Sequence, residues 1–344
     1  MTEADTRTTV LFTIDPPPEL RAHLTQALSG EPVDLLFAGR DDEAALIELA
    51  PRADAMVGWR VSGDVLQAAT KLRQYIFAGV GAQSVIEPLR ELEQRRRVTL
   101  VKSIANTYAT GQHAVALLLA LLNKVIPHHN WMAAGHWRRG DDWAQSTTLR
   151  GRNVGLLGYG AVNRHVHRFL AGFDVDFAIC RRSWADAEEL ALPTDALRFS
   201  EGELDPFLDA VDILFVGVPL TSRTRAMLGA EELGRLGPSG LLVNVARGAV
   251  IDEAALYEAL SEEVIAGAAL DVWYDYRPDP DDQQRRYPYR PQHAFHELDN
   301  VVLSPHRAAS PVFDLTRWDE VAEHLRRFIH GRPPQNVVDL EREY

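Results

Sequence analysis

The chain of 344 residues is 46% hydrophobic and 25% charged, which is ordinary for a globular protein but too long for one typical core, so we expect two domains. Its formal net charge of −13 argues against nucleic acid or an anionic membrane as a partner, because both would be repelled. The single cysteine, Cys180, excludes an intrachain disulfide and fits a reducing compartment.

The first hundred residues alternate short apolar segments with helical patterns. Their start lacks the basic flank and apolar run of a secretory signal. Strands are expected at 8–14, 33–39, 54–60 and 74–81, and helices at 19–28, 41–50 and 62–70. This alternation predicts a parallel α/β unit.

A long helix at about 107–125 leads into a second α/β series. Its apolar run, 114–122, is half the length that spans a bilayer, so it predicts a buried helix, and we expect a cytoplasmic protein with no membrane partner. Strands are then expected at 153–158, 176–180, 212–218, 240–246, 265–272 and 301–305, with an amphipathic helix at 311–330 and an extended piece at 331–339. Six strands with helices between them indicate a doubly wound nucleotide-binding sheet.

A glycine-rich turn, GYGAVN, stands between the first strand of this second series and a helix. Gly158 permits a tight turn, and Gly160 lets the backbone approach a pyrophosphate. The helix beginning at Ala161 and Val162 would stabilise that anion through its free N–H groups. Asn163 replaces the third glycine of the fingerprint and is expected to widen the helix–strand contact while leaving the phosphate site. The alternative is a glycine-rich turn without a ligand.

The end of the next strand predicts which dinucleotide is preferred. About 20 residues beyond the first glycine, an NAD site carries an acid that binds the ribose 2′-hydroxyl. This chain has Arg181 and Arg182 there, and guanidinium groups suit a 2′-phosphate. The hypothesis is NADP in preference to NAD; the alternative is that both arginines are solvated and NAD is used.

Several motifs, in a fixed order, carry a resemblance to a known family. They are GVGAQSV at 79–85, VPLTSRTR and NVARGAVID within 212–252, then AGAALDVW, NVVLSPHRA and GRPPQNVVD. Their order and spacing resemble the D-isomer-specific 2-hydroxyacid dehydrogenase family, which includes phosphoglycerate, glyoxylate/hydroxypyruvate, D-lactate and formate dehydrogenases. The resemblance covers nearly the whole chain, and the pair NVARG and SPH is highly specific.

The resemblance implies an α/β fold of two Rossmann-like doubly wound domains. An NAD(P)-binding domain, residues 106–308, would be inserted into a flavodoxin-like substrate domain made of residues 1–105 and 309–344. The active site would lie in the cleft. The resemblance also implies a homodimer, formed through the helix that begins near residue 107.

Two catalytic residues follow from the resemblance, and their chemistry fits. Arg247 follows a strand in NVARG, and its planar guanidinium could hold the carboxylate of a 2-keto acid while polarising the neighbouring carbonyl. His306 follows a strand in SPH, and an imidazole can give the proton that the nascent alkoxide needs. Taken alone, Arg247 could be a surface ion pair and His306 a loop histidine.

Other positions take their roles from the resemblance alone. Asp271 would lie near the nicotinamide carboxamide, although a strand-end cap is the alternative. Asn106 would touch a small substrate, and a plain helix start is an equal alternative. Further positions are Val218, Pro219, Val245 and Ala246 for the cofactor, and the backbone of Val80 and Gly81 for the substrate carboxylate.

The chain departs from the family where most members pair the catalytic histidine with a glutamate. That position is Tyr276, and three interpretations follow. First, Asp275 or Glu297 takes the place of the glutamate in an ordinary keto-acid reductase. Second, the substrate is unusual and needs no proton exchange. Third, the protein is a nucleotide-binding regulator. A His306 without a carboxylate should keep a pKa near ~6.5, so that reduction declines as pH rises through that value.

The loop at 277–297, with three arginines and two tyrosines, could cover the cleft or contact a second subunit, but a solvated surface insertion is the preferred interpretation. The histidine pairs at 128–129 and 165–167 lack accompanying ligands, so no metal is predicted. The sequence therefore predicts an NAD(P)-dependent oxidoreductase that acts on a small anionic 2-keto or 2-hydroxy acid such as glyoxylate or hydroxypyruvate. The alternative is a nucleotide-binding regulator with little turnover.

Overall fold

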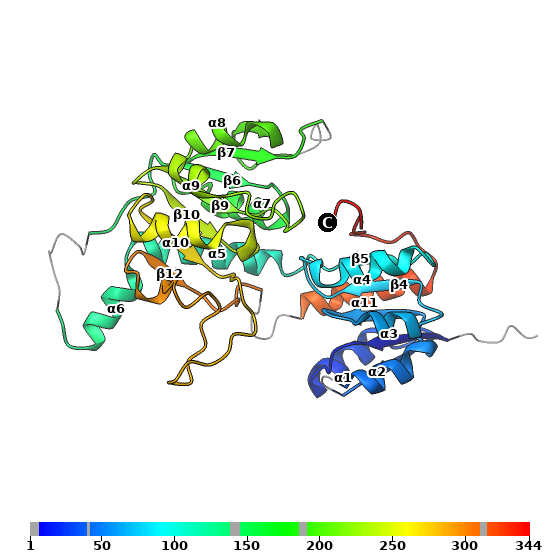
Figure 1. Cartoon of the computed structure of the whole chain (residues 1–344). Coiled ribbons are helices and arrows are strands. Elements are labelled where there is room, and N and C mark those ends of the chain that lie inside the picture. Colours follow the sequence, from blue (N-terminus) through cyan, green and yellow to red (C-terminus); the bar gives the residue numbers. More distant parts are fainter. Residues whose placement is uncertain (1–6, 40–41, 138–144, 186–190, 310–314) are drawn as a thin grey trace, which may run out of the picture. The chain divides into compact units, whose positions relative to one another are not determined.

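The computed structural model describes residues 7–39, 42–137, 145–185, 191–309 and 315–344. The chain forms two compact units: Met1–Asn106 with Val312–Tyr344, and Thr107–Pro311. Each unit has helices around its own parallel sheet, as Figure 1 shows. The predicted fold class, α/β with two Rossmann-like units, is confirmed.

The first unit has a five-stranded parallel sheet in the order β2-β1-β3-β4-β5. The strands are β1 (Thr8–Phe12), β2 (Val33–Phe37), β3 (Ala55–Gly58), β4 (Gln74–Phe77) and β5 (Thr99–Lys102). This is the flavodoxin-like order that the resemblance implied. The fifth strand was not predicted, because its four residues end in lysine and give little apolar signal.

Helices cover both faces of this sheet, because successive strand residues point to opposite sides. The helices are α1 (Pro18–Ala27), α2 (Glu43–Leu49), α3 (Gly63–Ala68), α4 (Gln83–Glu93) and α11 (Thr316–Ile329). Val10 and Phe12 of β1 pack in one cluster with α1 and α11, whereas Leu11 packs in the other cluster with α3 and α4. The C-terminal helix is thus part of the first unit's core.

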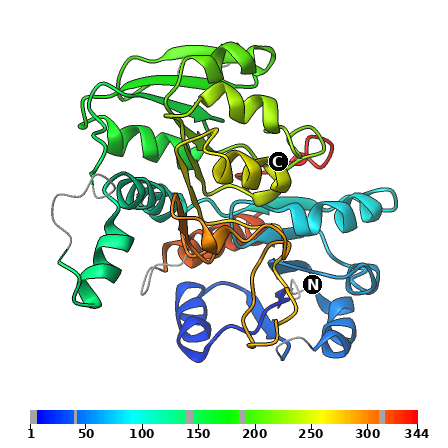
Figure 2. The same cartoon turned by 60° about the vertical axis from the view of Figure 1, so that its left-hand side comes forward.

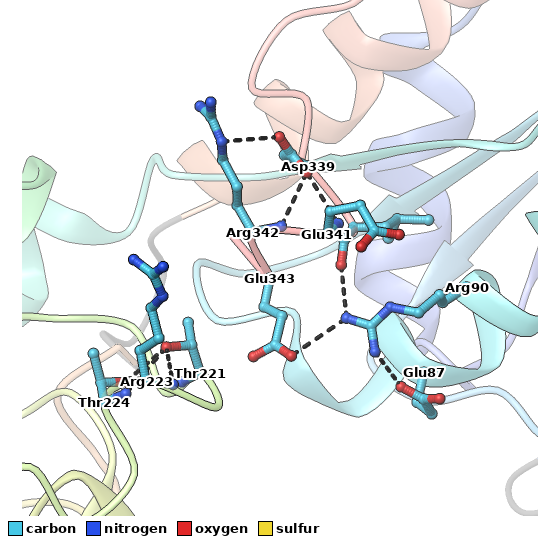
Figure 3. A network of polar contacts seen from close by, with 10 residues as sticks. Glu87, Arg90, Thr221, Arg223, Thr224, Asp339, Glu341, Arg342 and Glu343 are labelled. Carbon is cyan, nitrogen blue, oxygen red and sulfur yellow. Dashed lines mark hydrogen bonds and ion pairs between the residues drawn. The ribbon is translucent and has the colours of Figure 1, made fainter.

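The C-terminal segment protects the edge of this sheet. Val337 forms an antiparallel bridge with Val101 of β5, and the N–H of Val338 donates to the carbonyl of Leu100 at 2.9 Å. Arg90 of α4 fastens the end of the chain, donating to the Leu340 carbonyl at 2.7 Å and to Glu343 at 3.3 Å (Figure 3). Covering an edge strand in this way removes a template for aggregation.

The second unit has a seven-stranded parallel sheet in the order β12-β11-β10-β9-β6-β7-β8. The strands are β6 (Asn153–Leu157), β7 (Asp176–Arg181), β8 (Leu197–Ser200), β9 (Ile213–Val216), β10 (Leu241–Asn244), β11 (Gly267–Leu270) and β12 (Val301–Leu303). The predicted number of six strands is wrong by one. The strand that was missed, β8, lies at the sheet edge with Leu197 exposed, so it lacks the apolar run that marks a buried strand.

Helices again form two layers around the second sheet. The helices are α5 (Thr107–Leu122), α6 (Val125–Ala133), α7 (Ala161–Leu170), α8 (Leu204–Asp209), α9 (Ala230–Leu236) and α10 (Glu253–Ser261). Helices α5 and α7 share one core cluster with Val154 and Leu156 of β6, whereas α8, α9 and α10 share the other cluster with Leu157. The glycine-rich turn therefore leaves the sheet between two packed layers.

The long helix predicted at 107–125 ends early. Lys124 adopts a left-handed conformation (φ 48°), and the chain restarts as α6 with a bend of 63°. Among the described residues no single helix is long and apolar enough to cross a membrane; only this bent pair reaches the length and composition. In α5 the buried apolar residues are Ala114, Val115, Leu117, Leu118 and Leu122. Helix α6 projects away from its sheet and buries no residue (Figures 1 and 2).

The second half of the loop after β11 is not a solvated insertion, so the preferred interpretation of 277–297 is wrong for that half. Phe295 is fully buried, and Tyr289 is nearly so; both lie in the core cluster with Trp273. His293 contacts Glu253 of α10 at 3.1 Å, and the N–H of Arg290 donates to the same carboxylate at 2.7 Å. These contacts anchor the returning half of the loop to its own unit.

Candidate active site

Three neighbouring strands of the second unit end beside one another. Because β10, β11 and β12 are parallel, their carboxyl ends meet at one edge of the sheet, where ligands of such folds bind. Arg247 follows β10, Asp271 follows β11, and His306 follows β12. We call these three residues, together with Tyr276, the reaction end.

Local backbone packing fixes the turn that carries Arg247. The Asn244 side chain accepts from the N–H of Ala246 at 3.0 Å and donates to the carbonyl of Arg247 at 3.1 Å. Gly248 is required, because a Cβ there would lie 2.4 Å from the carbonyl oxygen of Trp273. The arginine turn is therefore pressed against the backbone that follows β11.

Arg247 presents a partly buried guanidinium. One of its nitrogens, Nη1, donates to the carbonyl of Ala246 at 2.6 Å. Burial lowers the pKa of Arg247, while the neighbouring Tyr276 opposes that shift. An arginine stays protonated even so, and a desolvated positive charge attracts a carboxylate more strongly than a solvated one.

Asp271 holds the turn on which His306 sits. Its carboxylate accepts from the Ser304 hydroxyl at 2.5 Å and from the backbone N–H groups of Arg307 at 2.8 Å and Ala308 at 3.0 Å. His113 of α5 contacts the same Ser304 hydroxyl at 2.9 Å. Burial alone would raise the pKa of Asp271, but these hydrogen bonds bring it below its usual value. The alternative of a capping role thus has direct geometric support.

His306 has Tyr276 as its partner, and no carboxylate takes that place among the described residues. The Tyr276 hydroxyl lies 2.8 Å from Nδ1 of His306. Asp275 instead accepts from the N–H of Arg277 at 2.8 Å, and Glu297 is an exposed side chain 3.9 Å from His296. In this structure neither Asp275 nor Glu297 occupies the place of the family glutamate.

The environment of His306 also corrects the expected pKa. Burial is the largest influence and lowers the pKa of His306 below 6.5; Arg247 lowers it further, whereas Asp271 opposes the shift. The histidine itself adopts a left-handed backbone conformation (φ 56°), which is uncommon for a residue with a side chain. Such strain persists where surrounding contacts impose it, and the bonds from Asp271 to the following two residues do so.

The glycine-rich turn follows β6 at the same sheet edge. Gly158 has φ 80°, and a Cβ there would lie 2.9 Å from Cγ1 of Val218, so the turn requires glycine. Around Gly160 a Cβ would meet nothing within 4 Å, which leaves room against the backbone. No side chain caps the N-terminus of α7, which begins at Ala161. An anion placed there would meet unshielded helix N–H groups.

Asn163 fits its position more closely than the sequence suggested. Its amide is buried and donates to the Gly158 carbonyl at 2.7 Å. A Cβ on Gly217, which follows β9, would lie 2.4 Å from the Asn163 amide nitrogen. Asn163 therefore fills volume that the third glycine of the fingerprint would have left open. Gly217, which follows the neighbouring strand, makes room for it. Gly217 was not predicted, although its place directly after an apolar strand was a signal.

The nucleotide end, as we call the glycine turn together with the end of β7, carries the two predicted arginines. Arg181 is half-buried, with its guanidinium 5.2 Å from the centre of the Trp184 ring, and Arg182 is exposed. Arg198 of β8 contacts the same ring at 4.8 Å. Trp184 and Arg198 were missed, since neither belongs to a motif. An open glycine backbone, an uncapped helix start and adjacent guanidiniums fit a dinucleotide.

The remaining predicted residues fall in two places. Val218, Pro219, Val245 and Ala246 follow β9 and β10 in the second unit, at the same edge as the reaction end. Val80, Gly81 and the buried Asn106 belong to the first unit. Within the described parts of the chain, no three His, Cys, Asp or Glu side chains are grouped so that they could hold a metal ion.

The amino-acid sequence matches known proteins over most of its length. The family described as D-isomer specific 2-hydroxyacid dehydrogenase, NAD binding domain, matches residues 115–308. Glyoxylate reductase from Pyrococcus furiosus is 31% identical over 312 residues, covering 86% of this chain and 85% of that protein. D-3-phosphoglycerate dehydrogenase from Archaeoglobus fulgidus is 30% identical over 299 residues, but the chain spans only 53% of its length.

Solved structures match the fold. An NADPH-dependent glyoxylate/hydroxypyruvate reductase from Sinorhizobium meliloti, in complex with NADP and malonate, has a TM-score of 0.77 at 25% identity, with 98% of each chain covered. A 2-hydroxyacid dehydrogenase from Ketogulonicigenium vulgare has a TM-score of 0.74 at 27% identity, covering 98% of this chain and 99% of that one. These likenesses extend over both units.

Proposed function

The chain belongs to the D-isomer-specific 2-hydroxyacid dehydrogenase family, and we propose that it uses NAD(P)H to reduce a small 2-keto acid such as glyoxylate or hydroxypyruvate at C2. The observation that carries the proposal is the reaction end. There, Arg247, Asp271 and His306 follow three neighbouring parallel strands, and the Tyr276 hydroxyl lies 2.8 Å from Nδ1 of His306. The names of the relatives, glyoxylate reductase above all, support the substrate class.

Arg247 performs two tasks in this reaction. Its guanidinium binds the substrate carboxylate and polarises the adjacent carbonyl, which a planar fork of donors does better than a point charge. The backbone N–H groups of Val80 and Gly81, with Asn106, complete the carboxylate site. The bound cofactor supplies the hydride that reaches C2. His306 then donates the proton to the substrate oxygen, on which negative charge develops.

The cofactor is held by Gly158 and Gly160 with the first turn of α7, and by side chains that line the same edge. Val218, Pro219, Val245, Ala246 and Asp271 belong to this second group. Arg181 and Arg182 favour NADP over NAD, because a 2′-phosphate can be bound by two guanidiniums. The solved relative with NADP supports this preference. In this proposal residues 106–308 form the cofactor domain, and residues 1–105 with 309–344 form the substrate domain.

We also propose a homodimer in a reducing compartment such as the cytoplasm. Four large apolar side chains on and just after α6 are exposed, and they are Val125, Ile126, Met132 and Trp137. Exposed apolar residues on one segment suit a protein contact, and a second copy of the chain fits the symmetric assemblies that soluble enzymes form. Sedimentation should give a dimer for the wild type and a monomer for Met132→Glu; an unchanged dimer in the variant would exclude this surface.

The experiment that tests the function is an initial-rate screen. Wild-type protein with NADPH or NADH should oxidise the cofactor when glyoxylate, hydroxypyruvate or a related 2-keto acid is added. Tight cofactor binding without turnover on any acid of the panel would instead support the nucleotide-binding regulator.

A further inference from the structure

The partner of His306 differs chemically from the carboxylate of the family. Tyr276 and His306 are joined at 2.8 Å between the phenol oxygen and Nδ1, with ring planes at 63°. The same phenol oxygen accepts from the backbone N–H of Trp273 at 3.2 Å. Both partners of Tyr276 are fixed, because Trp273 is buried and His306 sits on the turn that Asp271 holds.

The number of hydrogens decides which tautomer His306 adopts. A phenol has one hydrogen to donate. The phenol oxygen already accepts from the N–H of Trp273, so we infer that the phenol donates its hydrogen to Nδ1 of His306. Neutral imidazole carries a hydrogen on only one nitrogen, so the hydrogen of His306 is then on Nε2. A carboxylate partner can only accept, so it would impose the opposite tautomer, with the hydrogen on Nδ1.

The Nε2–H tautomer suits a ketone substrate. Among the described residues Nε2 of His306 makes no hydrogen bond, so it is free to donate to a substrate carbonyl. A neutral imidazole can polarise a carbonyl in this way, as the histidine of triosephosphate isomerase does. What a neutral imidazole lacks is a spare proton for the alkoxide.

We propose that Tyr276 is a positioning residue that supplies this proton through His306, which deepens the proposed function and rests on it. When hydride reaches C2, the Nε2–H bond breaks and an O–H bond forms on the substrate. At the same time the phenol O–H bond breaks and an Nδ1–H bond forms. His306 ends neutral with its tautomer reversed, and Tyr276 ends as a phenolate. The partly exposed phenolate then regains a proton from water.

Two neighbours of Tyr276 would stabilise a transient phenolate, namely the Trp273 N–H and the positive Arg247. Burial nevertheless keeps the pKa of Tyr276 above its usual value, and Asp271 adds to that shift. His306 is kept neutral at pH 7, because burial and Arg247 lower its pKa more than Asp271 raises it. Further titratable groups near the pair, among the described residues, are His113, which contacts Ser304, and Arg307, next to His306 in the chain.

The first test is the pH dependence of kcat for keto-acid reduction. Wild type should stay flat from about pH 6 to about pH 9, because the proton comes from a group with a raised pKa. Tyr276→Phe keeps the ring but removes the relay. Its kcat should fall as pH rises through the pKa of His306, below about 6.5, and should be at least about tenfold under wild type at pH 9.

Tyr276→Glu is the matched control, because it installs the family's carboxylate. It should restore turnover near neutral pH and lose it as pH rises further, since a carboxylate raises the histidine pKa. A Tyr276→Phe variant with the same flat profile as wild type would overturn the relay. A wild-type rate that declines through a pKa near 6 would overturn it too.

A second measurement does not depend on turnover. In protein labelled with 15N-histidine, the His306 resonances, assigned by their absence in His306→Gln, should show a hydrogen on Nε2 in wild type and on Nδ1 in Tyr276→Glu. A hydrogen on Nδ1 in an active wild type would refute the relay. The expected tautomer without turnover on any 2-keto acid would instead refute the proposed function.

Discussion

The reaction end and the nucleotide end lie at the same edge of one parallel sheet but are built differently. At the reaction end side chains are fixed by other side chains and by backbone, as the three bonds to Asp271 and the Tyr276–His306 contact show. At the nucleotide end the backbone itself is presented, with open space at Gly160. Chemistry at one carbon needs groups held in place, whereas a pyrophosphate needs room and unshielded N–H groups.

Removing the guanidinium from the reaction end should have the largest effect. Arg247→Ala should lower kcat for 2-keto acid reduction by about 10²- to 10³-fold, the range seen when one donor to a developing oxyanion is lost. Arg247→Lys should recover only part of that loss, because it lacks the planar fork. Cofactor affinity, measured by fluorescence titration, should stay near wild type in both variants. As a control, substitution of the exposed Arg286 by alanine should keep full activity. Equal losses of activity in both alanine variants would contradict the role of Arg247.

Asp271 holds the turn that carries His306, so its substitution should lower the stability of the protein as well as the reaction rate. Asp271→Asn removes the charge and one of the accepting oxygens of a buried group, so the free energy of unfolding should fall by about 1–3 kcal/mol in urea titrations. Because the pKa of folded Asp271 is below the unfolded value near 3.8, its contribution is present above that pH and is lost as pH falls through the folded pKa. The difference between wild type and variant should therefore be constant from pH 5 to 8 and shrink only in acid. Asp275→Asn, which alters a single loop contact, is the control.

At the nucleotide end, substitution of one glycine of the motif should affect stability, and substitution of the other should affect cofactor binding. Gly158→Ala forces a side chain into a left-handed turn and against Val218, so its free energy of unfolding should drop by about 1–2 kcal/mol. Gly160→Ala has room for its Cβ and an ordinary φ of −81°, so its melting temperature should match wild type. Its affinity for NADPH should nevertheless fall, because the Cβ occupies the approach of the pyrophosphate. Unchanged affinity in Gly160→Ala would place the dinucleotide elsewhere.

The smallest expected effect concerns the choice of cofactor. The double variant Arg181→Ala, Arg182→Ala should lose about tenfold in affinity for NADPH and little in affinity for NADH. A tenfold loss is about what one charge-assisted contact contributes. Arg150→Ala, an exposed arginine in the same unit, should change neither. Equal affinities of wild type for the two cofactors would remove the preference and leave the rest of the account intact.

The same contrast explains what the sequence could predict. Gly158, Gly160, Arg247 and His306 stand directly after apolar strands in recognisable motifs, so their shared edge followed from a parallel sheet. The partner of His306 did not follow, because Tyr276 approaches from an irregular loop whose path depends on the burial of Phe295 and Tyr289. The compensation between Asn163 and Gly217 joins residues distant in sequence, and β8 was missed because an exposed edge strand has no apolar pattern.

The most direct test of the central claim follows the hydride itself. Cofactor carrying deuterium at the transferable C4 position would be incubated with hydroxypyruvate, and the product examined by mass spectrometry and NMR. The account predicts one deuterium at C2 of a D-2-hydroxy acid, formed by wild type and nearly absent with Arg247→Ala. Oxidised cofactor without deuterium in the product, or label in an L-2-hydroxy acid, would contradict it.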